Sequence, residues 1–418
     1  MVPYRGIVVS LLAAIAAVLA AVPAQAKTLQ ACKMGCAYKS IQDAVDASDK
    51  GDVVKVKPGA YNEGVLVLGH KHDRLKLQGN PGNPNKVKLI QRRLHGAPAQ
   101  NAVAVSKADN VTITGFYARD FKTNGFYVEN ANGYKLDRLI AERDGEYGLF
   151  AFNSIGGSMT NSTAYYFNDS GFYVGQTPPQ RKPKRTKLSN LTAYLNVLGY
   201  SGTNSRYVDI ENSDWFNNGD GIVPNSLDSE KYPPNADNTI RNNRVFWNNF
   251  NYYLGGPFRE RETEVSEIPY PVGMGILLYG GRGNRLENNQ VFGNWLAGVE
   301  LTDAFTLKNP AKRPLVDNQV LNNSFGLNGT DLNGRDLAYE GGGSGNCFQG
   351  NQGVTTTFPA DGSTIVPCTT PPTANVFNEE VRNQAIAWAT DPTHESGWIP
   401  HEHAPQQGLT PVEHYGGS

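Results

Sequence analysis

Acidic side chains recur just ahead of a glycine in the middle of the chain. Glu146 and Asp169 each stand two residues before a glycine, Asp144 precedes Glu146, and Asp220 stands directly before Gly221. Paired carboxylates perform acid–base chemistry when their surroundings push their pKa values apart. We therefore predict these four as candidate catalytic carboxylates. The alternative, strongest for Asp220, is that acidic residues occupy turns for backbone reasons.

Three aromatic residues follow the same glycines. Tyr127, Phe150 and Tyr173 each lie two residues after a glycine in the phrases GFYV, GLFA and GFYV. Aligned on neighbouring strands about 4.8 Å apart, their rings would form one outward stripe. Such a stripe binds sugar rings through their apolar faces, or it serves only as packing between strands. Tyr173 is also a candidate catalytic acid.

Basic residues gather close to these positions. Residues 181–187 hold Arg181 and Arg185 among five cations, and Lys122 and Arg143 lie before the aromatic phrases. On a chain of net charge −1 this concentration favours an anionic ligand. We predict these four as ligand-binding residues, able to neutralise an acidic sugar or to take a proton from it. A solvated surface loop is the alternative for residues 181–187.

The glycines set the architecture. Gly125, Gly148 and Gly171 recur at a period of 23 residues, which is typical of a solenoid. Each phrase alternates as a short strand, with the residues one and three places after the glycine facing inward. Further anchors are expected at Gly199, Gly221, Tyr252, Gly275 and Gly298. The fold class is therefore all-β, a parallel solenoid.

Extra residues interrupt the period at four places, residues 177–187, 226–237, 256–273 and 304–314. We expect all four insertions to leave from one corner of the coil and to wall a groove beside the anchored strands. Five residues past the anchors, Asn130, Asn153, Gln176 and Asn204 are expected to form an amide ladder.

The N-terminal part supplies a resemblance. Residues 40–47 predict a short amphipathic helix capped by Ser40, followed by GDVVKVKPGAYNE. This resembles the N-terminal cap of right-handed parallel β-helix proteins, the superfamily of pectate lyases, polygalacturonases and mannuronan epimerases. Asn217-Asn-Gly-Asp220-Gly-Ile is similar to the Asp-Gly-Ile element of polygalacturonases. Their remaining catalytic motifs are missing here, so the resemblance implies the fold and a polysaccharide partner, and leaves Ca²⁺ open as a cofactor.

The chain start predicts export. Residues 7–22 are apolar and Ala24-Gln25-Ala26 fits a cleavage site, so residues 1–26 are predicted to be a signal peptide. A lipoprotein modified at Cys32 is the alternative. Export permits disulfides, which we assign locally as Cys32–Cys36 and Cys347–Cys368. A secreted or periplasmic monomer follows, with no transmembrane segment in the mature chain and no nucleic-acid partner.

Beyond the β-helix (residues 27–368), residues 369–418 should hold a linker, a helix over 378–389 and a Pro/His-rich tail. Four histidines fall in that tail, His394, His401, His403 and His414, but they carry no predicted metal site.

For function, we expect a lyase or C5-epimerase of a uronate-containing polysaccharide. A glycoside hydrolase with paired carboxylates is the alternative, as is a non-catalytic glycan-binding, adhesin or periplasmic accessory protein.

Overall fold

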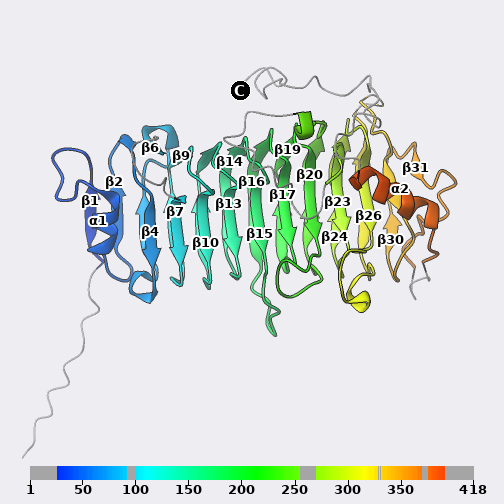
Figure 1. Cartoon of the computed structure of the whole chain (residues 1–418), viewed down its shortest axis with the longest axis horizontal. Helices are drawn as coiled ribbons and strands as arrows, with labels where there is room; N and C mark the ends of the chain where they lie inside the picture. The colour runs from blue at the N-terminus through cyan, green and yellow to red at the C-terminus, as the bar shows by residue number, and fades with distance from the viewer. Residues whose placement is uncertain are drawn as a thin grey trace, which may run out of the picture.

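The protein winds into an elongated coil of short parallel strands (Figure 1). The computed structural model describes residues 26–91, 100–254, 270–327, 329, 331–369 and 375–390. The predicted signal peptide, apart from Ala26, and all four tail histidines lie outside these residues. Within them, no helix is long and apolar enough to cross a membrane.

One face of the coil is an 11-stranded parallel sheet, which we call the anchored sheet because it carries the repeating glycines. Its strands are β4 (Val65–Leu68), β7 (Asn101–Ser106), β10 (Asn124–Glu129), β13 (Tyr147–Phe152), β15 (Ser170–Gly175), β17 (Leu198–Thr203), β20 (Asp220–Asn225), β23 (Met274–Tyr279), β26 (Ala297–Thr302), β29 (Leu337–Tyr339) and β31 (Thr357–Phe358).

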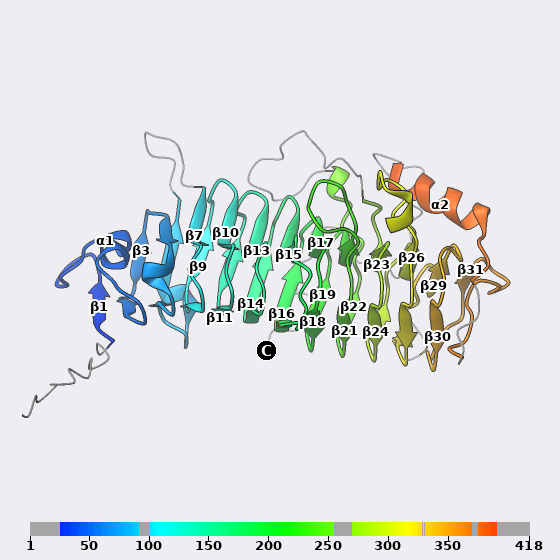
Figure 2. The ribbon, with the colours of Figure 1, turned by 90° about the horizontal axis from the view of Figure 1, so that it is seen from below.

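The other two faces are joined into a 20-stranded sheet, because β14 (Ser158–Tyr165) and β16 (Thr186–Tyr194) are long enough to span both (Figure 2). One face consists of β1 (Thr28–Ala31), β2 (Val53–Val56), β5 (Lys76–Gln78), β8 (Val111–Thr114), β11 (Tyr134–Asp137), β18 (Val208–Glu211), β21 (Thr239–Arg241), β24 (Arg285–Glu287), β27 (Gln319–Leu321) and β30 (Cys347–Gln349). The other consists of β3 (Gly59–Tyr61), β6 (Val87–Ile90), β9 (Tyr117–Arg119), β12 (Ile140–Glu142), β19 (Asp214–Phe216), β22 (Arg244–Phe246), β25 (Gln290–Phe292) and β28 (Ser324–Phe325).

The inward positions of the glycine phrases form the core, as the sequence predicts. Phe126, Leu149 and Phe172 are fully buried and stack in register on successive strands. Glycine is required beside them because the coils approach closely: a Cβ on Gly148 would lie 2.4 Å from the carbonyl oxygen of Gly171. The fold class is therefore confirmed as an all-β parallel β-helix.

Tyr252 is not an anchor, which corrects the predicted period. It lies in the 3-10 helix η3 (Tyr252–Leu254), and β20 pairs directly with β23. The chain from Gly221 to Gly275 is thus a single long coil. Of its second predicted insertion, residues 256–273, only 270–273 are described. They lead into β23 from β22, whereas the other three insertions follow strands of the anchored sheet, so the prediction of a single shared corner is wrong.

The edges of the anchored sheet therefore both carry insertions. In the view of Figure 1, the chain after β15, β20 and β26 forms loops at the lower ends of these strands, and η3 lies at the upper edge. The two sets of insertions face each other across the sheet.

Amide ladders line the interior corners. Asn196, Asn218, Asn248, Asn294 and Asn333 form one of them, in which each side-chain oxygen accepts the backbone N–H of the member before it. These buried amides satisfy backbone groups that the turns leave unpaired.

The predicted amide ladder at the opposite corner is only partly formed. Asn153 donates to Asn130 at 2.6 Å, as expected. Gln176 and Asn204 instead bind the backbone of residues 227–231. All four residues have positive φ, so they mark the same corner of the coil.

The ends are closed as predicted. Helix α1 (Ile41–Asp46) is capped by Ser40 and buries Ile41, Ala44 and Val45. Both disulfides form, Cys32–Cys36 and Cys347–Cys368. The first occupies the thiol that the lipoprotein alternative would need.

Helix α2 (Glu379–Thr390) begins and ends one residue later than the predicted helix. It lies against the outer face of the anchored sheet, near its C-terminal strands (Figures 1 and 2). Two more 3-10 helices flank the first coils, η1 (His70–His72) and η2 (Pro84–Lys86), and η4 (Pro310–Lys312) follows β26.

Candidate functional site

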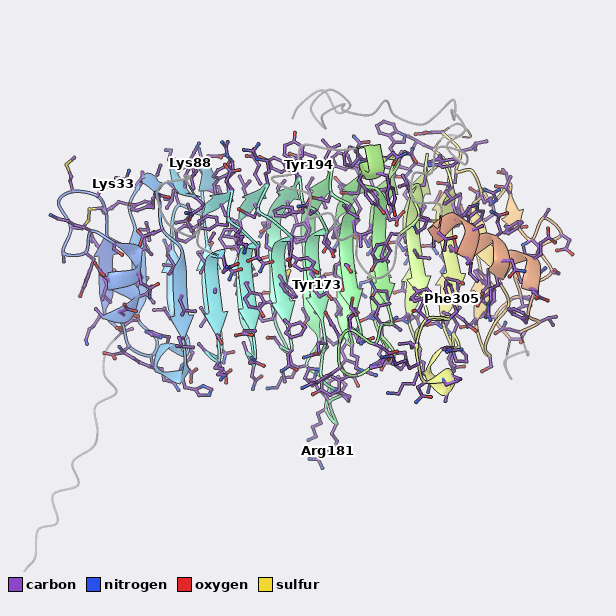
Figure 3. All side chains as sticks on the ribbon, viewed as in Figure 1. Lys33, Lys88, Tyr173, Arg181, Tyr194 and Phe305 are labelled. Carbon is purple, nitrogen blue, oxygen red and sulfur yellow. A yellow bond between two sulfur atoms is a disulfide. The ribbon has the colours of Figure 1, made fainter. Side chains whose placement is uncertain are left out.

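Carboxylates and tyrosines meet on the outer face of the anchored sheet, near its middle. We call the set of Tyr147, Asp169, Tyr173, Glu230 and Tyr270 the carboxylate–tyrosine cluster. Tyr173 marks its position in Figure 3, over the centre of the sheet. Its members come from two successive coils and from both insertions of the long coil.

Asp169 lies in the turn that leads into β15. Its backbone N–H donates to the carbonyl of Glu146, so the two acidic residues are neighbours on successive coils, as their spacing predicts. The Tyr147 hydroxyl donates to Asp169 Oδ2 at 3.2 Å. Oδ1 is buried and has no hydrogen-bond partner among the described residues. Burial, together with the nearby Glu146, raises the pKa of Asp169 to about 7.

Glu230 comes from the insertion after β20. Its carboxylate accepts a hydrogen bond from the Tyr173 hydroxyl, and its second oxygen is buried without a partner in the described part of the chain. Burial raises its pKa to about 7 as well, and the charge of Asp169 contributes to that shift. Asp169 and Glu230 are therefore close enough to influence each other's titration.

The aromatic stripe exists as predicted. Tyr127, Phe150 and Tyr173 are in register, with ring centroids 4.9 and 4.7 Å apart. Tyr147 packs against both Phe150 and Tyr173. Tyr127 and Phe150 are partly exposed, whereas Tyr173 is buried. The stripe therefore leads from an open surface to the two carboxyls.

Tyr270 completes the cluster from the opposite edge. Its hydroxyl accepts a hydrogen bond from Asn225 Nδ2 at 3.1 Å. Burial raises its pKa well above the ordinary value, and Asp169, Asp220 and Glu230 all add to the shift. Tyr270 thus lies among three carboxyls.

Asp220 lies farther along the same face. It is fully buried, Oδ1 accepts the Met274 N–H, and Oδ2 has no partner among the described residues. Burial raises its pKa well above the ordinary range. Glu300, on β26, is a second buried carboxyl with a pKa of about 8, raised by burial and by Glu340.

Asp144 and Glu146 differ from Asp169 in their positions. Asp144 is buried at an interior corner and accepts the backbone N–H of Phe121, as the ladder asparagines do for the coils before them. Glu146 is exposed at the edge of the cluster. Glu146 thus lies beside the cluster, whereas the Asp144 carboxylate supports the backbone of the preceding coil.

The predicted basic residues do not converge on the cluster. Arg185 pairs with Asp209 on β18, which belongs to the 20-stranded sheet. Arg181 projects from the tip of its loop (Figure 3). Arg143 pairs with Asp120. Lys122 is exposed in the turn before β10.

Sequence reasoning missed Glu230, Tyr270 and Glu300. Glu230 and Tyr270 lie in insertions, where the repeat gives no phase from which to place a side chain. The signal that pointed to them was indirect, namely the expectation that insertions wall the groove. Glu300 does occupy the outward middle position after Gly298, and that pattern could have identified it.

Among the described residues, no three carboxylate or histidine ligand atoms of the cluster lie within 4.8 Å of one another. In the described part of the chain, one set of carboxylate and histidine ligand atoms lies within 4.8 Å of one another: His70, Asp73 and Asp109, near the N-terminal end. Asp73 there already pairs with Lys50. We assign no Ca²⁺ site.

Comparisons with known proteins agree with the architecture. Residues 124–325 match the family model described as the right-handed beta helix region. The A-module of the mannuronan C-5 epimerase AlgE6 of Azotobacter vinelandii superimposes with a TM-score of 0.51 at 16% identity, covering 75% of this chain and 89% of that one.

The AlgE4 A-module of the same organism gives a TM-score of 0.48 at 15% identity, covering 76% of this chain and 84% of that one. No curated protein sequence matches the chain. The parallel sheets and the match to the family model identify the protein as a right-handed parallel β-helix, and likeness at this identity describes its fold alone.

Proposed function

We propose that the protein cleaves glycosidic bonds of a polysaccharide, with Asp169 and Glu230 as the acid–base pair. The observation that supports this most is their shared setting: two carboxyls from different segments, each bonded to a tyrosine hydroxyl, each with a pKa near 7. At neutral pH such a pair holds about one proton between them. One protonated carboxyl then donates to the glycosidic oxygen, while the ionised partner activates water or attacks the sugar.

Tyrosine hydroxyls donate hydrogen bonds to both carboxylates of the pair. Tyr173 and Tyr147 have pKa values raised well above the ordinary range, so both hydroxyls stay protonated and donate to the carboxylates. Tyr127 and Phe150 offer apolar ring surface beside the pair, which suits stacking against sugar rings. Packing between strands and sugar binding are therefore compatible, since the rings pack against one another and still expose part of their surface.

A lyase or C5-epimerase acting on a uronate polymer is the second candidate. The tyrosine hydroxyls beside the carboxylates favour it, because proton removal next to a uronate carboxyl needs an acid and a base. It also needs a cation against that carboxyl. Arg181 and Arg185 lie elsewhere, so we place this candidate behind hydrolysis.

A panel of pectic, alginate and neutral polysaccharides separates these activities. Hydrolysis yields new reducing ends without the ultraviolet absorbance of an unsaturated product, and a lyase yields both. An epimerase yields neither but changes the uronate composition seen by NMR. Binding without any product would contradict an enzymatic role and leave a glycan-binding protein.

A further inference from the structure

The outer face of the anchored sheet is open at one end and covered at the other. At the outward middle position, Leu66 on β4 is 44% exposed, and Tyr127 and Phe150 are partly exposed. From Tyr173 (3%) onward the same position is closed on every strand to β29. The closed positions are Ser201, Val223, Leu277, Glu300 and Ala338, none more than 5% exposed. The change falls at the carboxylate–tyrosine cluster.

At the upper edge, the described residues 250–254 and 270–273 supply one half of the cover. Phe250, Tyr252 and Val272 are buried in one apolar cluster with Val223 and Leu277 of the sheet. The hydroxyls of Tyr252 and Tyr253 donate to the carbonyl of Tyr270 at 2.8 and 2.9 Å. Since the Tyr270 hydroxyl is bonded to Asn225 of β20, this half of the cover is tied to the strand beneath it.

The lower-edge insertions supply the other half. Ala304 and Leu307, after β26, pack on Tyr279 of β23. The insertion that carries Glu230 is fixed by Asn204, whose amide donates to the Glu230 carbonyl at 2.8 Å. Leu227 of that insertion also packs against the Tyr279 group.

Helix α2 anchors the C-terminal end. Arg382 donates to Glu340 and Asp303 at 2.7 to 2.9 Å, and Glu340 is fully buried. Trp388 packs on Phe358, with the Arg335 guanidinium 4.8 Å from its ring centroid. The covered half is thus packed along its length and ion-paired at its C-terminal end.

We infer that the site accepts only the end of a glycan chain, and that the chain extends over the open coils from β13 toward β4. This rests on the proposed function. A sugar bound beyond the cluster would need space that Val223, Tyr252 and Leu277 occupy. The surface over the open coils leaves room for the remaining sugar units of the chain. Cleavage at the cluster therefore releases a short product from the chain end that occupies the site.

The number of chain ends tests this directly. The responding polymer is prepared at two average lengths and supplied at equal mass concentration. We expect the initial rate to rise in proportion to the number of chain ends, with one short product present from the first time point and solution viscosity falling slowly. A rate independent of length, with large fragments and an early loss of viscosity, would overturn the inference while leaving the proposed function intact.

A blocked path provides a second test. Ala104 on β7 occupies the outward position in register with Tyr127, three strand spacings, about 14 Å, from Tyr173. Ala104→Trp should slow turnover of the polymer several-fold and spare short oligosaccharides. The matched control is Thr112→Trp, on β8 of the other sheet, which should change neither rate. Equal rates of wild type and Ala104→Trp on the polymer would contradict the proposed path.

If no polymer is turned over, the proposed function fails and binding decides the inference. Titration calorimetry of the wild-type protein with long and short chains should give one protein bound per chain at both lengths. Several proteins per long chain, or no binding to any polymer, would overturn it.

Discussion

Asp169 and Glu230 are costly residues to bury, because an ionised carboxyl loses most of its hydration on leaving water. The hydrogen bonds from the Tyr147 and Tyr173 hydroxyls offset only part of that loss. The remaining cost of desolvation disfavours the ionised form and raises both pKa values to about 7, roughly three units above those of ordinary carboxyls. The site therefore retains protons that a solvated pair would lose.

The pH dependence of stability follows from these values. In the interval from about pH 4 to 7 the folded protein binds more protons than the unfolded chain, so the contribution of the pair falls as the pH rises. Glu230→Gln should therefore flatten the decline in stability between pH 5 and 7.5, measured as the midpoint of urea unfolding at each pH.

Asp137 provides the matched control for that measurement. Burial acts to raise its pKa, but hydrogen bonds from Asn161 and Thr160 prevail and lower it. Its stabilising effect is lost only as the pH falls below about 4. Asp137→Asn should lower the midpoint equally at pH 5 and 7.5. A steeper or unchanged decline in Glu230→Gln would contradict the pKa assigned to Glu230.

The positions of Asp169, Tyr173 and the aromatic stripe could be predicted because each holds a fixed phase relative to a glycine. Glu230 has no such phase. Its position depends on how a twelve-residue insertion folds back over the sheet, and local spacing carries no information about that path. Arg181 and Arg185 were misplaced for the same reason, since both lie in an insertion.

Among the elements, the insertion after β20 is the one on which the site depends. Asn204 holds it at several points: its amide donates to the carbonyls of Leu227, Glu230 and Lys231, and its oxygen accepts the Leu227 N–H. Gln176 accepts the Lys231 N–H. These corner residues thus fix the backbone that presents Glu230.

Asn204→Gly removes that support and keeps a residue suited to positive φ. We expect kcat to fall about tenfold or more, because a displacement of about 1 Å in a catalytic group has that effect. The pH profile should shift toward that of Glu230→Gln, which a purely structural defect would not produce.

Asn153→Gly is the control, because Asn153 stands at the same corner and its side chain hydrogen-bonds to Asn130 and not to the insertion that carries Glu230. It should retain the wild-type rate and profile. Equal losses in both variants would show that any glycine at this corner is harmful, and would contradict a positioning role for Asn204.

The whole molecule is a solenoid with one face half covered. Repeat, cap, fold class and both disulfides were predictable because they depend on local phase and on closing exposed ends. The cover over the outer face of the anchored sheet was not predictable in this way, because the sequence pattern made Tyr252 another anchor. With Tyr252 in a 3-10 helix, two expected coils become one, and its insertion moves to the opposite edge.

Helix α2 should stabilise the covered half. Arg382→Ala leaves Glu340 and Asp303 buried without their cation, at an expected cost of about 3 kcal/mol. Arg285→Ala removes an exposed pair with Glu287 and should cost less than about 1 kcal/mol. Hydrogen exchange of the backbone amides in β26 and β29 measures both. Similar losses would contradict a buried anchor.

In the proposed reaction, Asp169 and Glu230 together perform the chemistry. The most direct test compares wild type, Asp169→Asn, Glu230→Gln and Glu142→Gln on the polymer that responds in the panel, counting bonds broken per minute. Glu142 is the control, since it accepts hydrogen bonds from two tyrosine hydroxyls on another face. With all four proteins folded, we expect a loss of about 10²- to 10⁴-fold in Asp169→Asn and Glu230→Gln and none in Glu142→Gln. A wild-type rate in Asp169→Asn or Glu230→Gln would contradict the proposed reaction.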